Sequence, residues 1–194
     1  MSKVVVPGTL DADMGYGGEV LEIVEFTSEY SGIYEGDFET TGWNSKYHTL
    51  QLRWDNIVAN IDSDVLNVAI QKDDYFDISA TTDIFRYNHR YNSGGAGSSA
   101  SDAGIYVGYS SGTVTQERMS GWLNLHNCSE AQDHHLVYFN NEAINNDGAH
   151  YTGFGGSYNG TATTFKPQGI RLGWNNSLNY TVAGVVTLIG FNRV

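Results

Sequence analysis

Hydrophobic and polar residues alternate with a period of two along much of this chain. In the clearest case, residues 47 to 54, Leu50 and Leu52 alternate with the polar Gln51 and Arg53. Such alternation is typical of a β-strand with one buried face. Similar patterns predict further strands at residues 20–26, 66–70, 84–91, 104–109, 121–126, 135–139, 150–155, 169–174 and 184–191.

The remaining sequence contains few helix signals and many turn signals. No window keeps apolar residues at helical spacing over three turns, and only a short helical turn is expected, at residues 140–146. The chain has 23 glycines and only 2 prolines, which suits tight turns between strands. Short strands separated by Gly, Asn, Asp and Ser clusters predict an all-β sandwich or barrel.

A single domain is expected for residues 20–194, because 194 residues is an ordinary length for one all-β core. The stretch at residues 92–101 is rich in Ser and Gly and predicts a loop between strands, not a domain boundary. Residues 1–19 lack periodicity. They predict an extended N-terminal arm that reaches a neighbouring subunit, or else a frayed terminus.

Charge and cysteine content exclude several classes of protein. The formal net charge is −12, and the ten Lys and Arg residues are scattered, which argues against a nucleic-acid partner. Cys128 is the sole cysteine, so the chain cannot form an internal disulfide. No run approaches the roughly 20 apolar residues of a membrane helix, and residues 1–9 lack the apolar core of a signal peptide. We therefore expect cytoplasmic synthesis and no membrane partner.

The order of segments from about residue 30 to residue 194 resembles a family of small bacteriophage virion proteins. The similarity is carried by residues 47–54 and 64–70, an aromatic strand near Tyr87, a Ser/Gly loop, the segment Met119 to Asn127, and two closing segments. The closing segments are Gly169-Ile170-Arg171-Leu172 and residues 184–191. The chain departs from the family pattern at Trp122, where an acidic residue is usual, and at Ile189, where Tyr is usual.

This resemblance implies a jelly-roll, concanavalin-like antiparallel β-sandwich that serves as a virion structural protein. The expected role is capsid decoration, in which the protein covers or stabilises the shell through subunit contacts. The alternative is a tail or tail-fibre component that contacts the host surface or glycans. The expected partners are major capsid or tail proteins and further copies of the chain in a homotrimer. The expected location is the virion, assembled in the host cytoplasm, with no enzymatic activity and no cofactor.

A second hypothesis is that the protein is an enzyme. It rests on Glu35, Asp37 and Glu39, which a strand would place on one face. The spacing resembles the Glu-x-Asp-x-Glu strand of concanavalin-like glycoside hydrolases. By that resemblance these residues would be the nucleophile, the group that tunes the pKa values, and the acid/base. Gly32 and Gly42 flank the segment and favour a loop instead. A solvated acidic loop or a weak calcium site is the other interpretation.

Glycan recognition without catalysis is a third hypothesis. Aromatic side chains in Gly- and Asn-rich surroundings stack on sugar rings, and five residues are candidates: Trp43, Trp122, Trp174, Tyr151 and Tyr158. The alternative is that these aromatics pack in the core or in a subunit interface. The six histidines lack the convergent spacing of a zinc site, so no metal is expected. Arg171 is expected to pair with an acidic neighbour.

Overall fold

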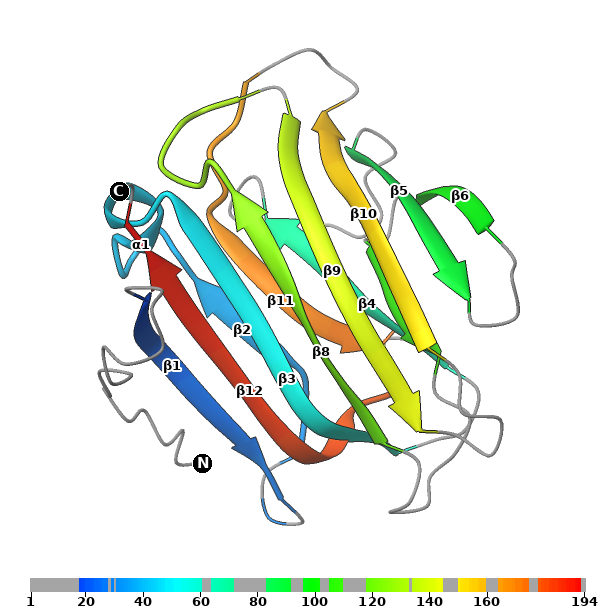
Figure 1. Ribbon diagram of the computed structural model, residues 1–194. Helices are drawn as coiled ribbons and strands as arrows, with labels where there is room; N and C mark the ends of the chain where they lie inside the picture. The colour runs from blue at the N-terminus through cyan, green and yellow to red at the C-terminus, as the bar shows by residue number, and fades with distance from the viewer. Residues whose placement is uncertain are drawn as a thin grey trace.

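Two antiparallel β-sheets face each other in the computed structural model of the protein (Figure 1). The structure describes residues 18–27, 29, 31–60, 64–71, 83–91, 96–101, 105–109, 118–132, 134–144, 150–159, 164–174 and 178–192. For residues 83–91, 96–101, 109, 134, 143–144 and 150–159 the backbone alone is described. The predicted all-β antiparallel sandwich is confirmed.

The larger sheet has eight strands. In spatial order they are β1 (Gly18–Phe26), β12 (Thr181–Phe191), β3 (Thr49–Ala59), β8 (Arg118–His126), β9 (His134–Ile144), β10 (His150–Asn159), β5 (Asp83–Tyr91) and β6 (Ala96–Ser101). Every neighbouring pair is antiparallel. The C-terminal strand β12 therefore lies between the first strand of the chain and β3.

The smaller sheet has four strands, in the order β2 (Tyr34–Asp37), β11 (Gly169–Trp174), β4 (Val65–Gln71) and β7 (Ile105–Tyr109). One short helix, α1 (Trp43–Lys46), connects β2 to β3. In the described part of the chain, no helix is long and apolar enough to cross a membrane.

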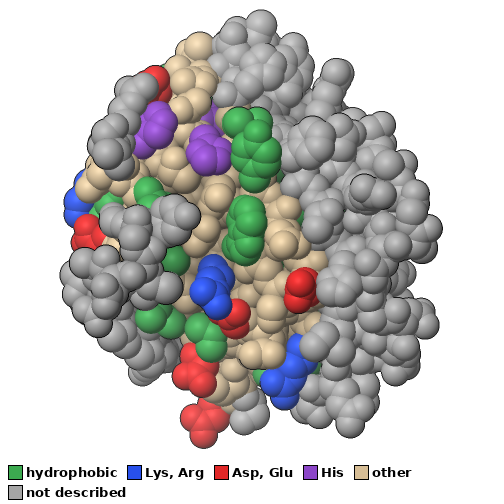
Figure 2. All heavy atoms as spheres, viewed as in Figure 1, with side chains coloured by type: hydrophobic (Ala, Val, Ile, Leu, Met, Phe, Trp, Pro, Cys, Tyr) green, Lys and Arg blue, Asp and Glu red, His purple; other side chains and the backbone are tan. Residues whose placement is uncertain are grey.

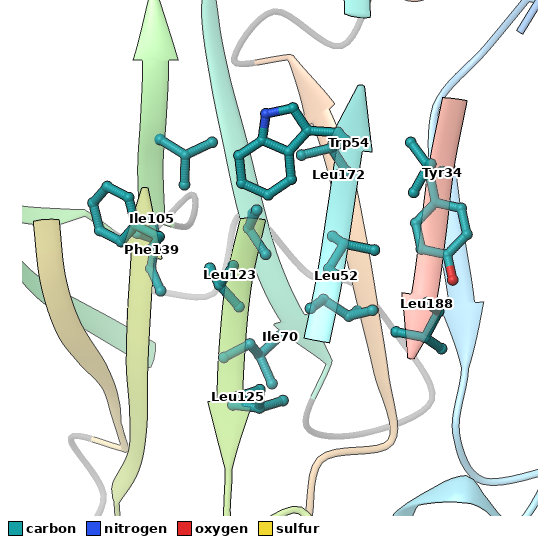
Figure 3. Close-up of a cluster of buried hydrophobic side chains, with 14 of the residues drawn as sticks. Tyr34, Leu52, Trp54, Ile70, Ile105, Leu123, Leu125, Phe139, Leu172 and Leu188 are labelled. Carbon is teal, nitrogen blue, oxygen red and sulfur yellow. The ribbon is translucent and has the colours of Figure 1, made fainter. Parts of the chain in front are cut away.

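The core lies between the two sheets and follows from the alternation in the sequence. Leu52, Trp54 and Leu123 of the larger sheet face Ile70 and Leu172 of the smaller sheet (Figure 3). Leu52, Trp54 and Leu123 are fully buried. Burying each large apolar side chain stabilises the fold by about 1.5–3 kcal/mol relative to leaving it exposed. The same alternation places the polar residues of β3 on the opposite, outer side of the larger sheet.

Several local predictions were wrong. The segment at Ala96–Ser101, expected as a loop, forms strand β6, because backbone hydrogen bonds to β5 do not depend on apolar side chains. Residues 140–144 continue strand β9 and form no helical turn. Residues 34–37, expected as part of a loop, pair with β11 as strand β2. Gly18 and Glu19 belong to β1, and the rest of the predicted arm lies outside the described residues.

Candidate functional site

The outer side of β3, β8 and β9 carries a mixed aromatic and polar surface, which we call the outer face. Its residues alternate with the buried ones along each strand. They are Thr49, Gln51, Arg53 and Asp55 on β3; Ser120, Trp122, Asn124 and His126 on β8; and Leu136, Tyr138, Asn140 and Glu142 on β9. Figure 2 shows this side of the molecule, with hydrophobic and histidine side chains close together above a basic and an acidic one.

Strand register arranges the middle of the outer face in two rows. In one row, Trp122 is the Cα partner of Arg53 on one side and of Asn140 on the other. In the next row, Asn124 is the partner of Gln51 and of Tyr138. The two aromatic residues therefore stand on a diagonal, where Cα atoms lie about 7–8 Å apart. Each row offers one aromatic ring beside hydrogen-bonding side chains.

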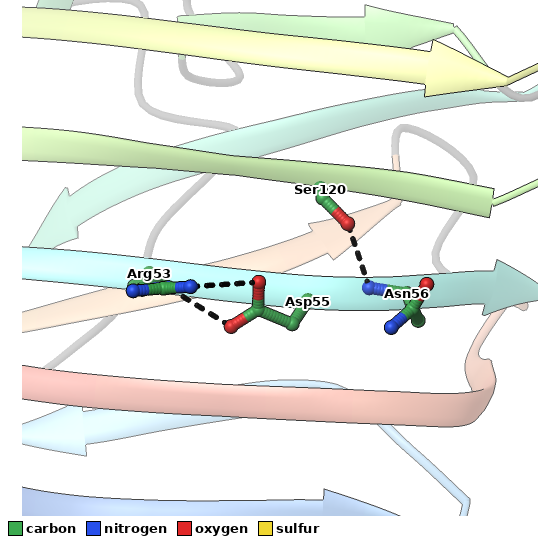
Figure 4. A network of polar contacts seen from close by, with 4 residues as sticks. All are labelled: Arg53, Asp55, Asn56 and Ser120. Atoms are coloured by element: carbon green, nitrogen blue, oxygen red, sulfur yellow. Dashed lines mark hydrogen bonds and ion pairs between the residues drawn. The ribbon is translucent and has the colours of Figure 1, made fainter.

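Side-chain hydrogen bonds hold this surface in place. Gln51 Nε2 donates to Asn124 Oδ1 across 2.8 Å. Arg53 Nε and Nη2 donate to the two carboxylate oxygens of Asp55 across 3.0 and 3.3 Å (Figure 4). This pair neutralises the guanidinium locally. Ser120 Oγ accepts from the backbone N–H of Asn56 across 2.9 Å, at the irregularity where β3 and β8 change register (Figure 4).

His126 forms the edge of the outer face next to Tyr138. The two rings meet edge to face, with centroids 5.8 Å apart and planes at 80°. His126 Nδ1 and Thr49 Oγ1 are 3.2 Å apart. Burial, followed by the charge of His48, lowers the pKa of His126. The neutral imidazole is therefore favoured, and it can both donate and accept a hydrogen bond.

The five aromatic residues predicted from the sequence do not form one platform. Trp174 is 2% exposed, and its indole nitrogen donates to Thr181 Oγ1 across 3.3 Å, so it is a core residue. Trp43 packs against the core from α1. Of the three predicted tryptophans, Trp122 alone lies on the outer face.

The two tyrosines of the prediction lie in β10, of which the backbone alone is described. Tyr151 pairs with Asn141 and Tyr158 with His134. Their side chains lie outside the described part of the structure.

Four further outer-face residues were missed by sequence reasoning: Gln51, Arg53, Asn124 and Tyr138. The alternation in residues 47–54 already placed Gln51 and Arg53 away from the core. Gln51 lies beside Asn124, 73 positions later in the chain, and Arg53 lies beside Trp122, 69 positions later, only because β3 pairs with β8. That pairing is not visible in a local pattern.

The three carboxylates proposed as catalytic residues in the enzyme hypothesis each have a different environment. Glu35 and Arg171 are Cα partners, and Arg171 Nε lies 3.9 Å from Glu35 Oε1, as expected of an acidic neighbour. Asp37 Oδ1 accepts from the backbone N–H groups of Glu39 and Thr40, each at 3.0 Å. Strand β2 ends at Asp37, so Glu39 lies in the following turn. The three carboxylates therefore do not share one strand face, which the enzyme hypothesis required.

Metal ligation and thiol chemistry are two further activities to which the described residues could contribute. They contain no group of three or more His, Cys, Asp or Glu side chains that could hold a metal ion. Cys128 is fully buried, and burial raises its pKa to about 12. Its Sγ donates to the backbone oxygen of Leu125 across 3.1 Å. A thiol in this state is inert as a nucleophile.

Comparison with known proteins identifies no family. No family model matches the chain, and no curated protein matches it. Among solved structures, a polysaccharide lyase of family 18 aligns at 10% identity, covering 98% of this chain and 85% of that one, with a TM-score of 0.18. At this TM-score the likeness carries no argument about fold or function.

Proposed function

We propose that the protein is a structural component of a bacteriophage particle, displayed on its surface. The proposal rests on the order of segments in the sequence, which resembles that of small phage virion proteins. The two closing segments of that order, β11 and β12, are inner strands of the two sheets. The resemblance therefore involves the parts of the sequence that build the sandwich.

The glycine of the closing Leu-Ile-Gly segment has a physical role in this fold. A Cβ atom at Gly190 would lie 2.5 Å from the ring of Tyr47. Tyr47 is buried, and its hydroxyl donates to Glu19 Oε2 across 2.6 Å, which links the end of α1 to β1. Gly190 thus lets an aromatic ring pack directly on the backbone of β12. The closing segment therefore has a packing role that a larger residue at position 190 would disturb.

A loop before β12 offers a contact for neighbouring subunits. Leu178 is 81% exposed and Tyr180 is 41% exposed. Between them, the buried Asn179 Nδ2 donates to Asp64 Oδ2 across 2.7 Å. The backbone N–H of Tyr180 also donates to Asn60 Oδ1 across 2.7 Å. The loop is therefore anchored while two large apolar side chains face outward, as in interfaces that bury preformed apolar groups.

Particle composition tests the proposal. Purified particles of the phage that encodes the chain are analysed by quantitative mass spectrometry, with the copy number scaled to the major capsid protein. We expect the chain to co-purify with particles at a fixed copy number through a density gradient. The proposal fails if the chain is abundant in the lysate but absent from the particle fraction.

A further inference from the structure

The outer face has the chemistry of a carbohydrate-binding surface. Trp122 is half-buried, and Tyr138 is 45% exposed, so both rings are held by the sheet and open on one side. A sugar ring presents C–H groups that pack on aromatic faces, and hydroxyls that both donate and accept hydrogen bonds. We propose that the outer face binds an uncharged, hydroxyl-rich glycan, with Trp122 and Tyr138 stacking on sugar rings.

Two amides beside the rings are already positioned for hydroxyl groups. The bond from Gln51 Nε2 to Asn124 Oδ1, 2.8 Å long, fixes both side chains in the row that contains Tyr138. Each amide retains donor and acceptor capacity beyond this bond. A ligand that meets amides fixed in advance pays less ordering entropy on binding.

The charge of the outer face favours an uncharged ligand. The outer face carries Arg53, Asp55 and Glu142, and the exposed Arg118 lies beside it at the start of β8, so over the three strands two positive charges balance two negative ones. The whole chain carries −12. A neutral surface on a strongly acidic protein suits a glycan without sulfate or carboxylate groups. A second copy of the chain would bring a further net charge of −12, and the two copies would repel each other.

This inference goes beyond the proposed place in the particle and is tested without particles. The recombinant full chain is titrated with soluble uncharged hexo-oligosaccharides, and with uronate and sulfated oligosaccharides as charged comparators. Binding is followed by calorimetry and tryptophan fluorescence. We expect binding to at least one uncharged oligosaccharide. Trp122→Ala is expected to weaken it at least about tenfold, which corresponds to roughly 1.4 kcal/mol.

Tyr180→Ala is the matched control, because it removes an exposed aromatic ring from the loop before β12 and leaves the outer face intact. Its affinity is expected to equal that of the unmutated chain, and thermal unfolding checks that each variant is folded. A second outer-face variant, Gln51→Ala, is expected to weaken binding as well. The inference is overturned by folded protein that binds no uncharged oligosaccharide, by preference for a charged one, or by equal affinity of Trp122→Ala and the unmutated chain. A dimer in sedimentation that Trp122→Ala dissociates would overturn it too, in favour of a second copy as the occupant.

Discussion

The indole nitrogen of Trp54 donates a hydrogen bond of 2.7 Å to Asn141 Oδ1 in the interior of the sandwich. Both side chains are fully buried. The amide nitrogen of Asn141 has no hydrogen-bond partner among the described residues. The bond from Trp54 is therefore the contact that holds the buried amide in place. It joins β3 to β9 across β8, the central strand of the outer face.

Replacing Trp54 by Phe is expected to destabilise the protein. The change leaves Asn141 Oδ1 without its donor, which costs about 1–3 kcal/mol of unfolding free energy, and the smaller ring loses packing in addition. Urea unfolding measures the effect. Trp122→Phe on the outer face is the control and should stay within about 0.5 kcal/mol. Equal losses for the two variants would contradict the role given to the buried bond.

Gly121 is expected to tolerate no side chain. A Cβ atom there would lie 2.3 Å from the backbone oxygen of Asn140 and 2.7 Å from the ring of Trp54. Gly121→Ala should therefore lower the unfolding free energy by about 1–3 kcal/mol through overpacking. Gly32→Ala is the control, because no heavy atom lies within 4 Å of a Cβ at that position. Thermal unfolding should leave Gly32→Ala unchanged or slightly stabilised, and a similar loss in both variants would count against the packing argument.

Asp37 and Glu39 are expected to differ in their effect on stability. Asp37→Ala removes the acceptor of two backbone N–H groups in the turn after β2, at a cost of about 1 kcal/mol. Glu39→Ala, an exposed position in the same turn, should change stability by less than about 0.5 kcal/mol. Chemical denaturation of both variants provides the comparison. Should Glu39→Ala prove the more costly change, the capping role of Asp37 would be wrong.

Acid is expected to weaken the fold through His126. Because burial lowers the pKa of His126, the unfolded chain takes up this proton at a higher pH than the folded chain does. Below the ordinary histidine pKa of 6.5 the unfolded state therefore binds more protons, and stability falls as the pH falls. His126→Gln should flatten this dependence as the pH falls through 6.5 and below.

Titration of the His126 ring by NMR checks the same prediction directly. The ring should titrate below 6.5 in the folded protein. A midpoint at or above that value would show that burial does not control this group.

Sequence periodicity predicted the strands that bury one face, because an apolar residue at every second position is a local signal. It missed β2 and β6, because both strands have little apolar content and form through backbone pairing. In β2, Glu35, Gly36 and Asp37 carry little apolar content, and the strand exists through pairing with β11, more than a hundred positions away. In β6, Ser and Gly residues pair with β5 through the backbone. Backbone pairing, whether with a distant strand as in β2 or with the preceding strand as in β6, leaves no periodic pattern in such segments.

The outer face could be predicted only in part. Trp122 was recognised by residue type, whereas Trp174 was grouped with it although it belongs to the core. Residue type does not say which side of a sheet an aromatic ring occupies when the strand is short. The pairing of Gln51 with Asn124 depends on register between β3 and β8, and a shift of one strand by one residue would turn its amide to the buried face and break the pair.

Cryo-EM of purified particles at side-chain resolution tests the central claim most directly. The account predicts density for this sandwich on the particle surface, with the loop of Leu178 and Tyr180 against a neighbouring subunit and the outer face around Trp122 directed to solvent. Repeated copies on the shell would favour capsid decoration, and a few copies at the tail would favour host-surface contact. A particle map fully accounted for by other proteins, with no density for this chain, would contradict the claim that it is a structural component of the particle.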